Sequence, residues 1–333
     1  MLAVIAYHSG VLHGGYLGVD VFFALSGFLI TALLRREWES RGGLIRLRDF
    51  YARRMLRLFP ALGCVVVASI LLAALMEAAG GVEEQPYAHA TINAVPWVGT
   101  FASNWAIAFN LSSLGSLAQT WSLAVEEQFY ILWPALFVLL MRRGYGRDRL
   151  ALWLTVAAMA ETVYRAAAPN LGFSQAQIHF GLDTHSSGLM VGCALAFWLT
   201  PARPLRRSQT RAALVAGAAW TGLTLLAAAF TFGGDKDPPA DEVVTLLASG
   251  VIVTALVAAR SSGGLGRILA SKPAVYIGRR SYGLYLWHYV IFSFVAAYRF
   301  VELPALRVKR RFQPMPSPHR ALSAQPGEGS QRH

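Results

Sequence analysis

The stretch DVFFALSGFLITALL, residues 20–34, contains one carboxylate, one serine and one threonine among apolar residues and glycine. About 20 mainly apolar residues in a helix cross the hydrocarbon core of a bilayer, so this stretch and its flanks predict a transmembrane helix. Residues 35–57, which follow, carry eight Arg against three acidic residues. A short basic loop after an apolar span is typical of the cytoplasmic side of a membrane protein.

Similar apolar runs recur along the whole chain. Of its 333 residues, 55% are hydrophobic and 14% are charged, whereas soluble domains carry about 25% charged residues. The net charge of +12 is concentrated in short loops, which favours a membrane over nucleic acid as the partner. We therefore predict an all-α fold, a polytopic transmembrane helical bundle of about nine spans. They are expected at about 1–12, 20–34, 60–79, 121–141, 150–168, 185–199, 212–232, 243–259 and 275–298.

Residues 92–110 are mainly apolar but are interrupted by Pro96 and several polar residues. The charges of the loops indicate whether this stretch crosses the membrane. If this stretch is re-entrant or interfacial and does not span, every basic loop falls on the cytoplasmic side. Nine spans then put the basic stretch LRVKRRF, residues 306–312, outside, so either one span is missed in this assignment or the chain lacks one. We predict a membrane-embedded domain over 1–311 and a disordered tail over 312–333, rich in Pro, Ser, Gln and Gly.

His8 and Asp20 flank a polar, glycine-rich loop between the first two predicted spans. A tight reversal brings the two side chains close together, and a carboxylate beside an imidazole makes it a better general base. The alternative is that Asp20 caps a helix N-terminus and His8 lies at the membrane interface.

Arginine is concentrated in RDFYARRMLRLFP, residues 48–60. On a helix Arg53 and Arg57 are four residues apart and Arg54 and Arg57 three apart, so they can share a face. Arg guanidinium groups match phosphate oxygens, and Tyr51 and Phe50 offer rings that can stack on a base. The alternative is that the cluster anchors the chain to anionic lipid headgroups.

Three further groups of polar residues fall in or near apolar runs. Glu126 and Glu127 enter the span at 121–141, where a carboxylate requires a cation, a wet cavity or a place at the interface. His288 lies among tyrosines and a tryptophan that are also typical of an aromatic belt. His179, Asp183 and His185 lack the spacing of a metal site, so we predict no metal.

Five motifs occur in order: GGYLGVDVFFALSGFLIT (14–31), FYARRMLRLFP (50–60), WSLAVEEQFYILWP (121–134), SYGLYLWH (281–288) and YRFVELPALR (298–307). Together they closely resemble the acyltransferase 3 family of integral membrane O-acyltransferases. The resemblance runs over about residues 1 to 311. It implies about ten transmembrane helices in a multi-pass protein, and we expect the bacterial inner membrane.

The resemblance also implies a function. Members transfer an acyl group, often acetyl, from acyl-CoA as donor substrate to a hydroxyl of a glycan, lipid or small metabolite, without a permanently bound cofactor. The histidine that matches His8 is taken as the base, and the arginines that match Arg53, Arg54 and Arg57 lie near the CoA phosphates. Glu126 matches a recurrent polar residue of the membrane core.

Asp20 or Glu126 is then expected to stabilise the imidazolium of His8. The family's Arg eleven positions before His8 falls ahead of Met1, and only nine residues, 289–297, separate two motifs that a further helix normally separates. We therefore expect a chain truncated at the N-terminus and shortened near the C-terminus. The alternatives are a glycan or lipid transporter or flippase, and an inactive fragment of such an acyltransferase.

Overall fold

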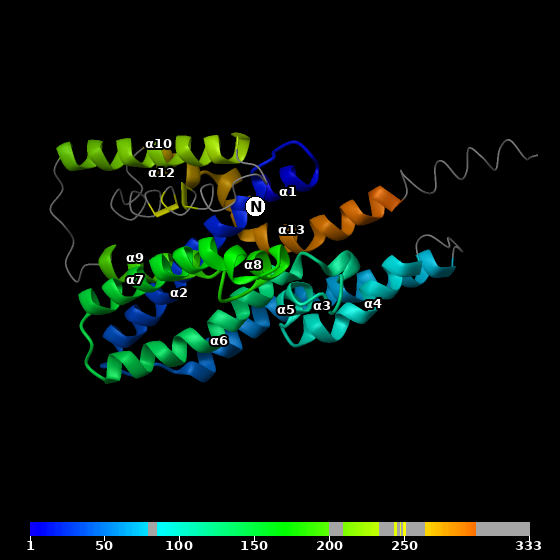
Figure 1. Ribbon diagram of the computed structural model, residues 1–333. Helices are drawn as coiled ribbons and strands as arrows, with labels where there is room; N and C mark the ends of the chain where they lie inside the picture. Colours follow the sequence, from blue (N-terminus) through cyan, green and yellow to red (C-terminus); the bar gives the residue numbers. More distant parts are fainter. Residues whose placement is uncertain are drawn as a thin grey trace, which may run out of the picture. The chain divides into compact units, whose positions relative to one another are not determined.

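A computed structural model describes residues 1–78, 85–199, 209–232, 243–244, 247, 249–250 and 264–297. All regular secondary structure in these residues is helical, which confirms the predicted all-α class (Figure 1). The elements are α1 (Leu2–His8), η1 (Gly15–Leu17), α2 (Gly18–Ser40), α3 (Leu47–Ala78), α4 (Gln85–Gly99), α5 (Ser103–Ala108), η2 (Gly115–Leu117), α6 (Thr120–Arg142), α7 (Arg147–Ala167), η3 (Ala168–Leu171), α8 (Gln175–Phe180), α9 (Ser187–Leu199), α10 (Gln209–Phe232), α12 (Gly264–Leu269) and α13 (Lys272–Ala297).

The chain divides into two compact units, Met1–Val290 and Ile291–His333. All the predicted site residues lie in the first unit. In the second, the structure describes only the end of α13, Ile291–Ala297, which is helical. The predicted tail, the motif at 298–307 and most of the span expected at 243–259 lie outside the described residues.

Three of the described helices are long and apolar enough to cross a membrane: Gly15–Ser40, Leu47–Ala78 and Thr120–Arg142. They correspond to the spans predicted at 20–34, 60–79 and 121–141, with the second helix described only as far as Ala78. Helices α7, α9, α10 and α13 also lie where spans are predicted, but they do not meet the same criteria. The apolar helices indicate an integral membrane protein, and the count of nine spans stays a prediction.

The first predicted span, 1–12, is wrong as a single helix. Helix α1 has seven residues and ends at His8, where Ser9 and Gly10 form a turn. Gly10 has φ +77°, a left-handed conformation that glycine adopts readily and that commonly ends helices. The stretch 92–110 is interrupted too: α4 ends at Gly99, and α5 begins only at Ser103.

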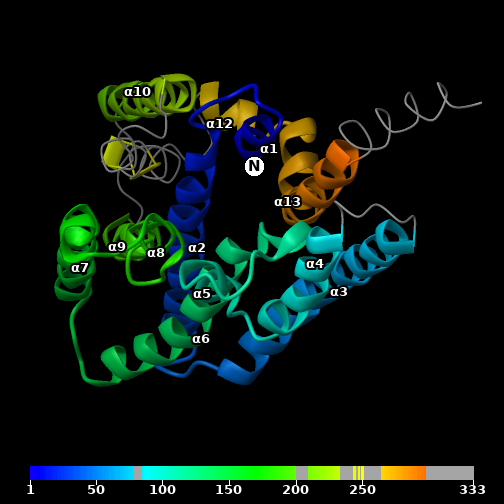
Figure 2. The same ribbon diagram turned by 45° about the vertical axis from the view of Figure 1, so that its right-hand side comes forward.

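Helices α2 and α9 pack closely because glycines bring their backbones together. A Cβ added at Gly27 would lie 2.0 Å from the carbonyl oxygen of Leu189, and one at Gly192 would lie 2.1 Å from that of Ala24. Arg35 of α2 donates to the carbonyl of Ala196 near the end of α9, at 2.8 Å. Helix α2 runs between the α7–α9 group on one side and α6 on the other (Figure 2).

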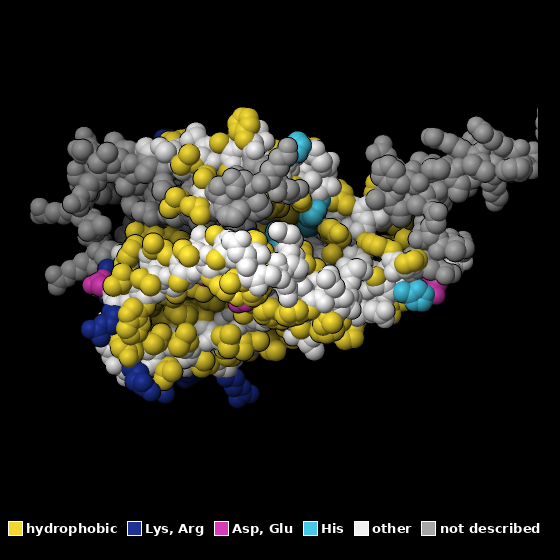
Figure 3. Space-filling view, viewed as in Figure 1, with side chains coloured by type: hydrophobic (Ala, Val, Ile, Leu, Met, Phe, Trp, Pro, Cys, Tyr) yellow, Lys and Arg dark blue, Asp and Glu magenta, His cyan; other side chains and the backbone are white. Residues whose placement is uncertain are grey.

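The charged side chains are unevenly distributed over the face shown in Figure 3. Most of the Lys and Arg side chains in view gather where α2 and α6 end and α3 and α7 begin, and hydrophobic side chains cover much of the rest. The loops 41–46 and 143–146, which follow α2 and α6, both lie at this basic end. This arrangement agrees with the positive-inside pattern of those two loops.

Candidate active site

A buried ionic cluster joins α2, α3 and α6. Arg54 donates from Nε and Nη2 to Oε1 of Glu127, at 2.9 and 2.7 Å, and its Nη2 lies 3.6 Å from Oε1 of Glu126. Ser26 donates to the same Glu126 oxygen at 2.5 Å, and so does the hydroxyl of Tyr130. Carboxylates inside a bilayer are costly unless such partners satisfy them. We call these five residues the Glu126 cluster.

The cluster combines one cation with two carboxylates. The side chains of Arg54, Glu127 and Glu126 are 17%, 10% and 5% exposed. The Arg54 guanidinium also lies 3.2 Å from the centre of the Tyr130 ring, a cation–π contact that its low exposure strengthens. Because these partners converge on Glu126 from three helices, its carboxylate has a fixed position.

The arginine motif is helical, as predicted, but its members face different ways. Consecutive residues on a helix do not share a face. Arg54 turns to the two carboxylates, whereas its neighbour Arg53 is exposed, and so is Arg57, although it is only three residues from Arg54. Arg53 lies 3.9 Å from Glu37, and the hydroxyl of Tyr51 donates to the main-chain carbonyl of Ile131. The structure does not bring the four predicted CoA-binding residues together, and Arg54 binds carboxylates where we predicted a phosphate.

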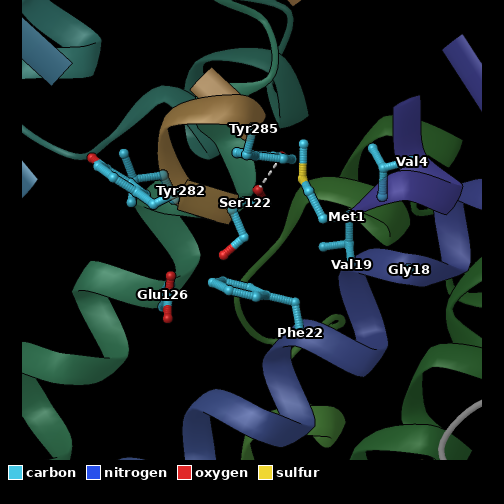
Figure 4. Close-up of a pocket in the computed structure, with 11 residues that line it drawn as sticks. Met1, Val4, Gly18, Val19, Phe22, Ser122, Glu126, Tyr282 and Tyr285 are labelled. Atoms are coloured by element: carbon cyan, nitrogen blue, oxygen red, sulfur yellow. Dashed lines mark hydrogen bonds between the residues drawn. The ribbon is translucent and has the colours of Figure 1, made fainter. Parts of the chain in front are cut away.

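A pocket lies beside the cluster and contains about 470 Å³ of space free of atoms, its open side included. The Glu126 carboxylate, the Ser122 hydroxyl and the Phe22 ring border it (Figure 4). It is lined from α2 by Gly18, Val19 and Phe22, from α6 by Ser122, Leu123 and Glu126, from α13 by Ser281, Tyr282 and Tyr285, and from the start of the chain by Met1 and Val4.

Two hydroxyl groups form a hydrogen-bonded pair on the pocket wall. Ser122 Oγ and Tyr285 OH are 2.5 Å apart, and the Tyr285 hydroxyl donates to the main-chain carbonyl of Gln119 at 2.9 Å (Figure 4). The sequence marked Tyr285 only as part of an aromatic cluster and did not mark Ser122. The pocket therefore has polar groups on an otherwise largely apolar wall.

His8 lies close to this pocket but is not part of its lining. It is an exposed residue at the end of α1, the helix that contributes Val4. Its ring centre is 5.2 Å from that of His288 and 5.2 Å from that of Tyr289, and the His288 ring is 5.4 Å from Tyr285. A row of aromatic rings thus connects His8 with the pocket wall.

Asp20 does not pair with His8 as expected. Its carboxylate lies 3.0 Å from Nε2 of His185, at the end of the loop before α9, and both side chains are buried. The short polar loop 9–17 allows His8 and Asp20 to approach each other, but Asp20 faces the α7–α9 side of α2 instead. Its helical neighbours Val19 and Phe22 line the pocket.

Of two residues that donate to Glu126, the sequence could predict one and not the other. Tyr130 is four residues after Glu126 and so shares its helix face, a signal that spacing alone contains. Ser26 comes from α2, and no local pattern links it to Glu126.

Among the described residues, no three metal-ligating side chains lie close enough to hold an ion.

The comparisons with known proteins assign the family. A family model described as an acyltransferase domain matches residues 1–307. The chain therefore belongs to the acyltransferase 3 family, as its five motifs suggested. No solved structure matches the chain significantly.

Three bacterial relatives illustrate the similarity. The chain is 33% identical over 309 residues to the peptidoglycan O-acetyltransferase OatA of Listeria monocytogenes, a match that covers 88% of this chain and 48% of the relative. It is 31% identical to the putative peptidoglycan O-acetyltransferase YrhL of Bacillus subtilis, covering 87% and 46%. It is 30% identical to the O-acetyltransferase OatA of Staphylococcus aureus, covering 90% and 50%. The chain spans about half the length of these curated relatives.

Proposed function

We propose that this chain transfers an acyl group, acetyl by analogy with its relatives, from acyl-CoA to a hydroxyl of a glycan at the membrane. The observation that carries the proposal is the pocket, where the fixed Glu126 carboxylate faces space bordered by the segment that leads into His8. The names of the relatives support O-acetyl transfer and a carbohydrate acceptor. They give no support to a transporter.

The donor enters from the basic end. Arg53 and Arg57 are exposed on α3 and four residues apart, so both guanidinium groups can bind the phosphates of CoA from one side. Arg54 stays with the carboxylates. The thioester then extends past Tyr282 into the pocket, whose mostly apolar wall accommodates a short acyl chain.

The transfer needs one base. The imidazole of His8 takes the proton of the acceptor hydroxyl as its oxygen attacks the thioester carbonyl carbon. The new C–O ester bond forms, the C–S bond breaks, and the imidazolium returns the proton to the CoA thiolate. Glu126 contributes negative charge that stabilises the imidazolium at a distance. Asp20, which is bonded to His185, has no direct part in this step.

The acceptor hydroxyl approaches His8 from the side opposite the basic end. His8 is exposed, so a large acceptor such as a glycan can reach it without entering the pocket. The chain acts as a multi-pass protein of the bacterial inner membrane, with the CoA site facing the cytoplasm.

The test measures CoA release by the full chain in nanodiscs, with acetyl-CoA as donor and soluble peptidoglycan fragments as acceptor. We expect His8→Ala to abolish both the release of CoA that depends on the acceptor and the formation of the acetyl ester. His13→Ala is the matched control, because His13 is an exposed histidine in the adjoining loop. Full activity of the His8→Ala variant would remove His8 from the mechanism. Transport of acceptor without CoA release would overturn the proposed reaction.

A further inference from the structure

We propose that His185 is a positioning residue: an imidazolium hydrogen-bonded to Asp20 that holds the pocket-lining face of α2 in place. The proposal deepens the proposed function, and its structural half is testable without any activity.

Both ring nitrogens of His185 face hydrogen-bond acceptors. Nε2 lies 3.0 Å from the carboxylate of Asp20, and Nδ1 lies 2.7 Å from the main-chain carbonyl of His179. A carbonyl oxygen and an ionised carboxylate accept only. Both nitrogens therefore donate, which requires the doubly protonated ring.

The charges around the pair support the same protonation state. Asp20, Glu161, Arg165 and His185 are all buried, with 4%, 7%, 5% and 3% exposure. Buried charges are tolerated when they are paired and hydrogen-bonded. The buried Asp20 carboxylate contacts His185 directly, and an imidazolium there gives it a paired, hydrogen-bonded counterion.

The other groups of this network have their own fixed contacts. Oε1 of Glu161 accepts from the main-chain N–H of Ser186, and Arg165 donates to the carbonyl of Thr184 at 3.1 Å. His179 lies in α8, between the predicted spans. Its burial, together with the charges of His185 and Arg165, lowers its pKa to about 3. His179 is therefore neutral, and its main-chain carbonyl is the acceptor that faces Nδ1 of His185.

The ion pair connects the pocket wall with the rest of the protein. On α2, Asp20 faces His185, while Val19 and Phe22 on the other side of the helix line the pocket. The Trp121 ring, next to the pocket residue Ser122, lies 5.3 Å from the His185 ring. If the pair is lost, a buried charge is left unpaired and α2 has to shift, which moves the wall of the pocket.

The first experiment measures the protonation state directly. In ¹⁵N-histidine-labelled protein in nanodiscs, solid-state NMR distinguishes imidazolium from neutral rings, and the signal missing from His185→Gln assigns His185. We expect both ring nitrogens of His185 to carry a proton in the folded protein at pH 7, as the two acceptors require. A neutral ring at pH 7 would overturn the proposal, whatever the enzymatic activity.

The second experiment measures kcat and KM for acetyl-CoA. We expect His185→Gln and Asp20→Asn each to lower kcat by about 10- to 100-fold, the effect of a displacement of about 1 Å. The double variant lowers kcat no further, because both changes remove one ion pair. His89→Gln, which changes an exposed histidine of α4, is the matched control and keeps the parent kcat.

Replacement by another cation separates positioning from proton transfer. We expect His185→Arg to recover part of the kcat lost in His185→Gln, with the parent pH profile. Loss of the alkaline or acidic limb of the profile in His185→Arg would identify His185 as a proton carrier and refute the positioning role. If the parent lacks acyl transfer altogether, the proposed function fails while the NMR result still decides the ion pair.

Discussion

Replacement of Arg54 by Gln removes the cation of the Glu126 cluster and leaves two buried carboxylates facing each other. Gln keeps much of the side-chain length and some hydrogen bonding but no charge, so the variant isolates the electrostatic contribution. Because Glu126 and Glu127 are 5% and 10% exposed, water cannot replace the lost guanidinium. We expect a large loss of stability.

The magnitude follows from the geometry. At 2.7 Å and an effective dielectric constant of about 20, the gross attraction of Arg54 and Glu127 is about 6 kcal/mol. Desolvation of the charges offsets part of it, and removal of one partner from a buried pair typically costs about 3–5 kcal/mol. The exposed neighbour Arg53 gives the matched control: Arg53→Gln should cost less than about 1 kcal/mol.

The assay is thermal unfolding of the detergent-solubilised chain, supported by denaturant titration. We expect Arg54→Gln to have a much lower midpoint than the parent or Arg53→Gln. In the double variant Arg54→Gln with Glu127→Gln, about 1–2 kcal/mol returns, because only Glu126 remains charged and its donors Ser26 and Tyr130 are intact.

Two outcomes would refute this reasoning. One is an Arg54→Gln variant as stable as Arg53→Gln, which would mean that the two carboxylates do not need the cation. The other is a double variant less stable than Arg54→Gln, which would mean that Glu127 contributes to stability independently of Arg54.

Three further predictions concern packing, hydrogen bonding and pH. Gly192→Ala should destabilise the chain by about 1–3 kcal/mol, because its Cβ would overlap α2, whereas Gly63→Ala, in open space, should be neutral or stabilising; equal thermal midpoints would contradict the close approach. Ser26→Ala should cost about 1.5–3 kcal/mol in the same assay, since it removes a hydrogen bond to the Glu126 carboxylate; an unchanged midpoint would show that bond to be unimportant. The folded-state pKa of His179, about 3, is below its unfolded value, so the unfolded chain binds one more proton between these two pH values. The free energy of unfolding therefore falls as the pH drops from about 6.5 towards 3. His179→Phe should weaken this dependence of stability on pH, and an unchanged dependence would argue against a buried neutral His179.

Much of the local structure was readable from the sequence. Apolar runs predicted α2, α3 and α6, and the Arg54 motif lies on a helix as its spacing required. The extent of the first span was not readable, because a seven-residue helix and the turn at Gly10 contain the same apolar residues that a longer helix would. Hydropathy measures composition over a window and does not detect such a break.

The site was only partly predictable for a related reason. Polar residues in apolar spans mark a site, and Glu126 does border the pocket. Which partner each polar residue takes depends on its direction around the helix axis, and that direction has meaning only relative to neighbouring helices. Asp20 was expected beside His8 because the loop between them is short, yet it faces His185.

By itself the sequence determined the helical class, the membrane character, the family and the residue types available for chemistry, because these follow from composition, periodicity and motifs. Only the tertiary structure decided that Arg54 pairs with Glu127 and Asp20 with His185, residues 73 and 165 positions apart. Such pairs form where helices approach closely, as α2 and α9 do at Gly27 and Gly192. The burial that results then forces each charge to find a partner of opposite sign.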